Sequence, residues 1–264
     1  MITISIDPII FSIGHFMVRW YSLIVTFAIV VGVWVTWREA KRKGVAEEYF
    51  GDAVLWVIIG GMIGARLFHV IDHWRDEYAL NPIRVLYIWE GGLAIWGAVI
   101  GGGIALALFA WRRGLQFGRL VDTATPGLVL GQALGRFACI ITGDAMGKAT
   151  TGPIGFAYTS PSAMVPQLGV YYTPTPVYEI ITNFVLFGLV WRLRNKNLPD
   201  GALFLIYLTL YSAGRFIITF WSSYQIVAFG LNQAQLISLI SLIVGLPLLV
   251  RLLRKNTEAH AALS

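Results

Sequence analysis

Long apolar runs separated by short polar stretches dominate the chain. A helix needs about 20 apolar residues to cross roughly 30 Å of hydrocarbon, and the runs have about that length. The pattern therefore predicts an all-α integral membrane protein, with residues 1–264 forming a single polytopic membrane domain. We predict seven transmembrane helices, at about residues 18–37, 52–71, 92–111, 122–142, 176–191, 201–221 and 233–250. The longest connection between them is residues 143–175.

The composition agrees with a membrane protein and excludes two other classes. Hydrophobic residues make up 57% of the chain and charged residues only 13%, whereas soluble domains carry about 25% charged residues. An aromatic content of 14% excludes a disordered chain. Cys139 is the only cysteine, so neither an internal disulfide framework nor a thiolate zinc cluster is available.

Lysine and arginine are concentrated in alternate connections between the predicted spans. Thirteen of them lie in segments 38–51, 112–121 and 192–200 and in the tail after residue 250. The other connections hold only Arg75, Arg84 and Lys148. Because cytoplasmic loops carry the excess of basic residues, we expect the N-terminus outside and the C-terminus in the cytoplasm. The net charge of +6 is then a topology signal, which argues against a nucleic-acid partner.

Arg19 begins the first predicted span and can extend its charge to the outer surface, whereas Arg66, Arg136 and Arg215 lie further inside their spans. An arginine at the bilayer centre costs about 2.5–3.5 kcal/mol on insertion scales, so such residues usually face the bundle interior and mark a substrate path. Arg136 and Arg215 both lie several residues inside the outer ends of their spans and can converge beneath the outer loop. We expect the two guanidinium groups to bind one phosphate bidentately, and a lipid phosphodiester is the most available anion at that depth.

The alternative is that these arginines pair with carboxylates. Four carboxylates lie in spans or at their edges: Glu90, Asp122, Asp144 and Glu179. For Arg66 both interpretations stay open. Polar neighbours support a pocket around the other two arginines, since Tyr211 shares a helix face with Arg215 and Tyr21 lies near the outer end of the first span.

Two further patterns have simpler explanations. The glycines Gly60, Gly64, Gly97 and Gly101 have the small-residue spacing of closely packed transmembrane helices. His69 and His73 flank Asp72, but the HExxH pattern of a zinc site is absent, and we predict no metal and no cofactor.

These residues give the sequence a recognisable resemblance, along nearly its whole length, to bacterial prolipoprotein diacylglyceryl transferases. The matching stretches are IDPIIFSIGHFMVRWYSL (6–23), GGMIGARLFHV (60–70), WEGGLAIWGAVIGG (89–102), GRFACIITGDAMGK (135–148), PTPVYE (174–179) and LYSAGRFIITFW (210–221).

The resemblance implies transfer of diacylglyceryl from phosphatidylglycerol to the lipobox cysteine thiol of a preprolipoprotein signal peptide, the first step of lipoprotein maturation. Glycerol phosphate leaves and a thioether forms. The implied location is the bacterial cytoplasmic (inner) membrane, with the active site toward its outer side, and the implied partners are these two substrates and membrane lipid.

The resemblance also implies roles for individual residues. It places four residues in catalysis: Arg215, Tyr21, Tyr211 and Asp144. Arg136 matches the signature arginine that binds the phospholipid head group, Gly147 closes that signature, and Glu179 matches the glutamate of the family's YE pair. With Arg66, these three form the predicted substrate-binding set.

Several positions depart from the family pattern. Cys139 and Thr142 stand where the signature has asparagine, Asp144 replaces its glutamate, and Thr219 stands where many members carry glutamate. Trp96 occupies the position of a histidine proposed as general base, and tryptophan cannot titrate.

The sequence leaves the proton acceptor open among four residues: Tyr21, Tyr211, Asp144 and His69. These departures also leave open a non-enzymatic lipid-binding or lipid-moving paralogue, with a metal-dependent hydrolase as a more distant alternative.

Overall fold

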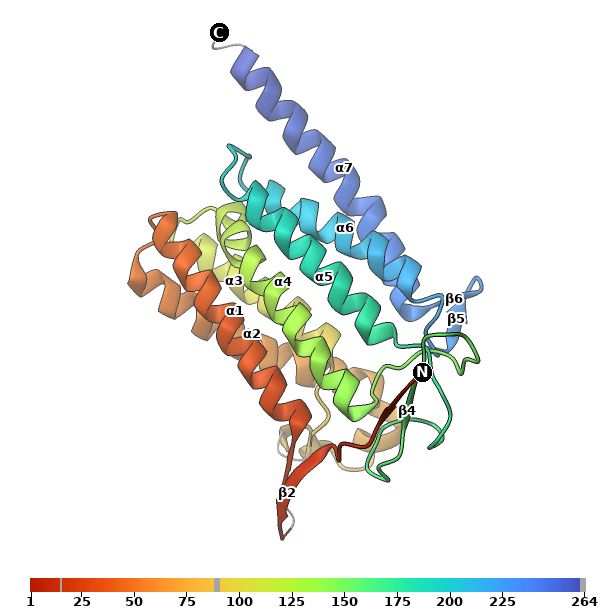
Figure 1. Ribbon diagram of the computed structural model, residues 1–264. Coiled ribbons are helices and arrows are strands. Elements are labelled where there is room, and N and C mark those ends of the chain that lie inside the picture. Colours follow the sequence, from red (N-terminus) through yellow and green to blue (C-terminus); the bar gives the residue numbers. More distant parts are fainter. Residues whose placement is uncertain (15, 88–90, 262–264) are drawn as a thin grey trace. The chain divides into compact units, whose positions relative to one another are not determined.

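The computed structural model describes residues 1–14, 16–87 and 91–261, and its main elements are seven α-helices (Figure 1). They are α1 (Trp20–Arg42), α2 (Glu47–Asp72), α3 (Ile95–Arg112), α4 (Phe117–Thr142), α5 (Thr175–Leu193), α6 (Ala202–Ile218) and α7 (Gln233–Ala261). Each predicted span falls on one of them. Within the described residues, six helices are long and apolar enough to cross a membrane, and α6 is a shorter apolar helix of 17 residues.

Helix ends extend beyond the predicted spans where the sequence becomes charged. Helix α2 begins at Glu47 rather than near residue 52, and its first-turn acidic residues suit the positive end of the helix dipole. Helix α7 continues past residue 250 through a basic stretch. Hydropathy detects only the part of a helix that suits hydrocarbon, so it misses these polar turns.

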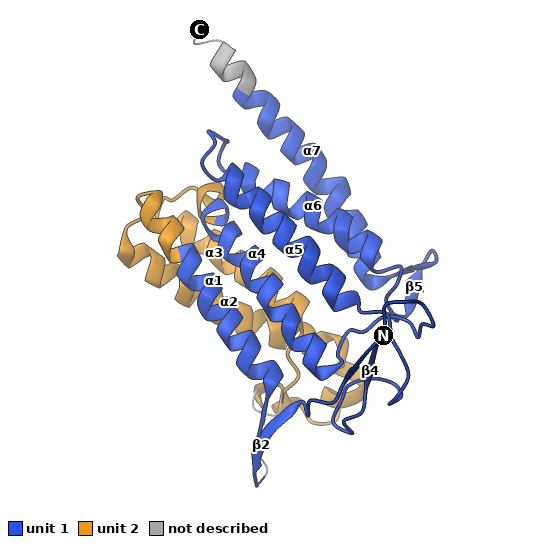
Figure 2. Cartoon of the chain, in the orientation of Figure 1, with its two compact units in different colours: residues 1–36, 121–264 blue, residues 37–120 orange. Residues whose placement is uncertain are grey.

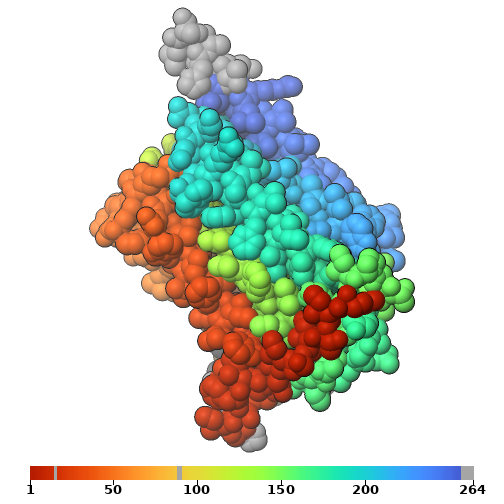
Figure 3. All heavy atoms as spheres, in the orientation of Figure 1, coloured from red at the N-terminus to blue at the C-terminus, as the bar shows by residue number. Residues whose placement is uncertain are grey.

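The prediction of an all-α protein omits six short strands at the helix ends. They are β1 (Ile2–Ile4), β2 (Ile9–Ile13), β3 (Phe16–Arg19), β4 (Phe156–Tyr158), β5 (Ile226–Ala228) and β6 (Leu231–Asn232). Strands β2 and β3 form an antiparallel hairpin, as do β5 and β6, whereas β1 pairs in parallel with the distant β4, so that the N-terminal residues lie against the 143–174 connection (Figure 3). Strands this short have too few residues for an alternating pattern to be recognised.

The chain divides into two compact units, drawn in different colours in Figure 2. Residues 37–120 form one unit, in which α2 packs against α3 and is followed by a π-helical turn, η1 (Trp74–Tyr78), and a 3-10 turn, η2 (Pro82–Leu86). A Cβ atom on Gly64 would lie 2.3 Å from the carbonyl oxygen of Gly97. The predicted close glycine packing of these helices is thus confirmed. The single-domain organisation stays a prediction.

The other unit, residues 1–36 and 121–264, contains α5, α6, α7 and most of α4. Its core lies between α4, α5 and α6, where Val129, Leu186, Val190, Leu203 and Tyr207 are buried together. The buried Asp122 of α4 fixes the start of α6, because its carboxylate accepts hydrogen bonds of 2.8 Å from the N–H groups of Gly201 and Phe204. These N–H groups at a helix N-terminus have no partner within the helix, so α4 caps α6.

The 143–174 connection in the same unit packs around its own small core of Met146, Tyr158 and Tyr172. The Tyr158 hydroxyl donates a 2.7 Å hydrogen bond to the carbonyl oxygen of Ile140, near the end of α4. Burial raises the pKa of Tyr158 well above its ordinary value. Its phenol therefore stays protonated and keeps donating, which holds the connection against the end of α4.

Candidate functional site

Three helices of one unit bring three charged side chains together. Arg136 lies near the end of α4, Glu179 near the start of α5 and Arg215 near the end of α6. The two segments that leave from this end of the helices are the 143–174 connection and residues 219–232. The charges therefore lie beside the long connection, as the sequence predicts.

A single carboxylate holds both arginines. Glu179 pairs through Oε2 with Nε of Arg136 and through Oε1 with Nη1 of Arg215. Glu179 is only 7% exposed, and both guanidinium groups are largely buried. The two arginines thus meet at one point. The predicted alternative that these arginines pair with carboxylates is confirmed for both, except that they share Glu179 instead of having separate partners.

Both guanidinium groups keep further hydrogen-bonding capacity around this shared carboxylate. Nη1 of Arg136 donates to Sγ of Cys139 at 3.8 Å, and the Tyr211 side chain is close enough to Arg136 to interact with its charge. Nη2 of Arg215 donates to the Tyr224 hydroxyl at 3.2 Å. Since each guanidinium has five N–H donors, these bonds leave donors for another anion. The Arg136–Glu179–Arg215 cluster itself has one net positive charge.

Tyr21 and Asp144 lie at the edge of this cluster. Tyr21, in the first turn of α1, lies near Cys139, and it is close enough to Asp144 and Arg136 to interact with their charges. Asp144 makes no ion pair within the described residues, and its N–H donates to Oγ1 of Thr142 at 3.4 Å. The chain turns sharply here, since Gly143 and Ala145 both have positive φ values, of 75° and 57°. This turn places the Asp144 carboxylate just after α4, near Tyr21 and Cys139.

Tyr211 is held in place by α6 and α4. Its ring packs on that of Tyr207, with centroids 5.6 Å apart, and the Tyr207 hydroxyl donates to Oε1 of Gln132 at 2.6 Å. The structure thus gathers six predicted residues from four helices and the turn after α4: Tyr21 of α1, Arg136 of α4, Asp144 of the turn, Glu179 of α5, and Tyr211 and Arg215 of α6.

Gly147 has a packing role that accounts for its glycine. A Cβ atom there would lie 2.3 Å from the carbonyl oxygen of Trp221 and 2.9 Å from Cβ of Thr173. Its own N–H donates to the Thr173 carbonyl oxygen at 2.8 Å. Glycine therefore lets the 143–174 connection pass close to the segment after α6, and the predicted contact of Gly147 with substrate stays a prediction.

Arg66 belongs to the other unit, where its partners are backbone carbonyl oxygens. All five of its N–H groups are engaged: Nε donates to Val85, Nη1 to Gly91 and Gly92, and Nη2 to Arg84 and Tyr87. Arg66 is only 7% exposed. The interpretation that it pairs with a carboxylate is wrong for the described residues, although Glu90 lies outside them. Its role in substrate binding stays a prediction.

Trp96 and His69 are in the same unit as Arg66. Trp96 is in the first turn of α3. The His69 ring stacks on that of His73, with centroids 4.2 Å apart, and its Nε2 lies 3.8 Å from a carboxylate oxygen of Glu77. Within the described residues, no group of three or more histidine, cysteine, aspartate or glutamate side chains is arranged to hold a metal ion.

Two residues near Glu179 and Arg215 are not predicted as site residues from the sequence. Tyr224 contacts Arg215 both through its hydroxyl and through its ring, whose centroid is 5.6 Å from the guanidinium carbon. Asn183, one turn after Glu179, is buried and its Oδ1 has no hydrogen-bond partner. Asn183 could have been identified from the sequence, because a polar amide within an apolar span stands out. Tyr224 could not, because it reaches Arg215 only where the chain turns back after α6.

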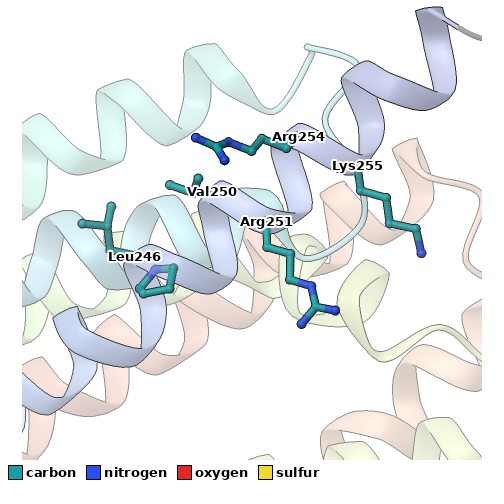
Figure 4. Close-up of a pocket in the computed structure, with 6 residues that line it drawn as sticks. Leu246, Val250, Arg251, Arg254 and Lys255 are labelled. Carbon is teal, nitrogen blue, oxygen red and sulfur yellow. The ribbon is translucent and has the colours of Figure 1, made fainter.

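The structure also has a surface pocket on α7, lined by Leu246, Pro247, Val250, Arg251, Arg254 and Lys255 (Figure 4). All these residues come from the later part of α7, whereas the segment after Arg215 contacts Asn232, which directly precedes the start of α7. The pocket is therefore a feature of the basic end of α7 and is separate from the arginine cluster.

Comparison with known proteins connects this geometry to a family. The family model described as prolipoprotein diacylglyceryl transferase matches residues 8–251. A phosphatidylglycerol–prolipoprotein diacylglyceryl transferase of Dehalococcoides mccartyi is 36% identical over 260 residues, which are 98% of each chain. The protein of the same name from Halalkalibacterium halodurans is 38% identical over 248 residues, covering 92% of this chain and 85% of the relative. The Bacillus cereus protein is 36% identical over 258 residues, covering 97% and 95%.

The shared ion pair predicts the effect of Glu179→Gln. The substitution keeps the shape of the side chain but leaves two guanidinium groups without a counter-charge, and breaking a buried pair costs about 3 kcal/mol or more. We expect a lower melting temperature in detergent, with recovery on addition of inorganic phosphate that exceeds any effect on the parent chain. The matched control is Asp144→Asn, which removes an unpaired carboxylate. Equal stability of Glu179→Gln and the parent would show that the shared carboxylate does not hold the helices together.

Proposed function

Because the chain belongs to the prolipoprotein diacylglyceryl transferase family, we propose that it transfers the diacylglyceryl group of phosphatidylglycerol to the lipobox cysteine of preprolipoproteins. The observation that carries this proposal is the convergence of Arg136 and Arg215 on one carboxylate. The chain is a phospholipid-dependent transferase, and its partners are phosphatidylglycerol and a preprolipoprotein.

The arginine cluster suits a lipid phosphate. A phosphodiester carries one negative charge, which balances the net positive charge of the Arg136–Glu179–Arg215 cluster. Its two non-bridging oxygens accept from N–H donors of both guanidinium groups, and arginine is suited to such bidentate binding. Glu179 keeps the two guanidinium groups in place, so that the lipid phosphate binds to a preorganised pair rather than drawing two repelling cations together.

The reaction is a nucleophilic displacement at the glycerol carbon that bears the phosphate. The cysteine sulfur forms a C–S bond to that carbon, the C–O bond breaks, and glycerol phosphate leaves with the electron pair. The two arginines stabilise the charge that develops on the departing phosphate. The thiol has an unperturbed pKa near 8.5, and nearby arginines increase its thiolate fraction. Asp144, which makes no ion pair with any residue that the structure describes, receives the thiol proton, directly or through Tyr21.

This proposal includes the topology of the chain. All seven helices span the bacterial inner membrane, with the N-terminus outside, the C-terminus in the cytoplasm and the arginine cluster toward the outer side. The support is the distribution of basic residues, which includes Arg251, Arg254 and Lys255 near the end of α7. Helix α6 is short, but its 17 residues extend for about 26 Å at 1.5 Å per residue, which is close to the hydrocarbon thickness.

Labelling of introduced cysteines tests the topology. Cys139 is buried, so the parent chain provides a low background. We expect a membrane-impermeant thiol reagent to label Gln167→Cys in intact cells and to label Lys196→Cys only after the membrane is opened. Protection of Gln167→Cys in intact cells, with labelling of Lys196→Cys, would reverse the orientation.

A reconstituted reaction tests the transferase activity itself. Purified chain, phosphatidylglycerol and a lipobox peptide should give a diacylglyceryl thioether on the peptide cysteine, detected by mass spectrometry. A peptide with serine in place of that cysteine is the control. Retention of phosphatidylglycerol without thioether product, under conditions where a relative is active, would favour the lipid-binding or lipid-moving alternative that Trp96 leaves open.

Arginine-to-lysine variants test the shared phosphate. Lysine keeps the charge but lacks the planar fork of donors, so Arg136→Lys and Arg215→Lys should each lower the transfer rate by about 10²–10³. The double variant should lose little more than either single one, since removing one arginine already displaces the head group. Arg192→Lys, on the basic side of the helices, is the matched control. Near-parental rates in both single variants would contradict binding of one phosphate by both residues.

A further inference from the structure

The hairpin formed by β5 and β6 exposes an apolar tip. Ile226 is 71% exposed, Val227 65% and Phe229 95%. A two-residue turn, Phe229–Gly230, joins the strands, and both residues have positive φ values, of 53° and 73°. Such turns favour asparagine followed by glycine, because most side chains are strained at positive φ. Phenylalanine at the first position therefore combines backbone strain with a phenyl ring that has almost no protein contact.

The surroundings of this tip are unlike those of an aqueous loop. No charged residue and no histidine occurs between Arg215 and Arg251, a segment that includes the whole hairpin. Strand β6 ends at Asn232, and the candidate membrane span of α7 begins at Gln233. Four extended residues reach at most about 14 Å, so Phe229 stays close to the membrane surface, where the head-group layer begins.

We propose that the β5–β6 hairpin inserts its tip into the head-group and acyl-chain boundary of the lipid bilayer. The bilayer supplies the apolar contacts that Phe229, Ile226 and Val227 lack in the protein. Aromatic side chains are enriched at this boundary. The energy gained by burying the exposed ring in lipid compensates for the strained turn, which is the kind of local cost that persists at functional positions.

The hairpin is tied to the arginine cluster at its base. Tyr224, two residues before β5, accepts the hydrogen bond from Arg215. Ser223 donates to the carbonyl oxygen of Met146 at 3.1 Å, and Nδ2 of Asn232 donates to that of Thr219 at 3.3 Å. Insertion of the tip therefore fixes the depth of Arg215 relative to the lipid head groups. This consequence rests on the proposed function, because it concerns delivery of a lipid phosphate to Arg215.

Spin labelling measures the depth of the tip without any need for activity. A nitroxide on Phe229→Cys, in chain reconstituted into phosphatidylglycerol–phosphatidylcholine vesicles, should be relaxed strongly by oxygen and weakly by a water-soluble nickel chelate. The reference is Gln167→Cys, an exposed polar position in the 143–174 connection. Equal accessibility of the two labels to the nickel chelate would overturn the insertion.

The substitution Phe229→Asn distinguishes the effect of the backbone turn from the effect of the apolar ring. Phe229→Asn suits the positive φ, so the melting temperature should stay the same or rise, while the apolar ring is lost. We expect the KM for phosphatidylglycerol in vesicles to rise about three- to tenfold with kcat unchanged, and Phe229→Trp to retain the parental KM. An unchanged KM in Phe229→Asn would overturn the link between the tip and lipid delivery. Failure of the parent chain to transfer lipid would refute the proposed function. The depth of the nitroxide on Phe229→Cys would still show whether the hairpin tip inserts into the bilayer.

Discussion

The Glu179 carboxylate between two guanidinium groups is the interaction on which the arrangement of α4, α5 and α6 depends. Arginines are costly inside a membrane, and two of them at one point also repel each other. One buried carboxylate offsets both costs, since each of its oxygens pairs with a different helix. Because it supplies one negative charge for two positive ones, the cluster remains attractive to a further anion. The same contact therefore supports the fold and prepares the phosphate site.

The residues that depart from the family signature find partners in the backbone or in Arg136. Thr219 donates its hydroxyl hydrogen bond to the backbone carbonyl oxygen of Arg215, at 2.8 Å, so it provides no second carboxylate. Thr142 donates to the carbonyl oxygen of Ala138 at 3.0 Å and accepts from the N–H of Asp144. It thereby supports the turn that positions Asp144. Cys139 accepts a hydrogen bond from Arg136 through its sulfur. These residues satisfy backbone groups or Arg136, and Glu179 remains the acidic partner of both arginines.

The sequence predicts the helices well because hydrophobic runs of about 20 residues have few alternative structures. It also identifies Arg136 and Arg215, since a charge within an apolar span stands out. It predicts neither the shared use of Glu179 nor the five carbonyl partners of Arg66, because both depend on which segments meet in three dimensions. The pairing of β1 with β4 and the contact of Tyr224 with Arg215 are hidden for the same reason: each depends on a chain reversal that no local pattern records.

The dual role of the cluster requires that Arg136 and Arg215 bind the same lipid phosphate while Glu179 holds them together. An experimental structure of the chain with phosphatidylglycerol bound, in a lipid nanodisc, tests it most directly. We expect one phosphate whose non-bridging oxygens lie within hydrogen-bonding distance of both guanidinium groups, with Glu179 still paired with each. A head group that contacts only one of the two arginines, or that lies away from both, would contradict it.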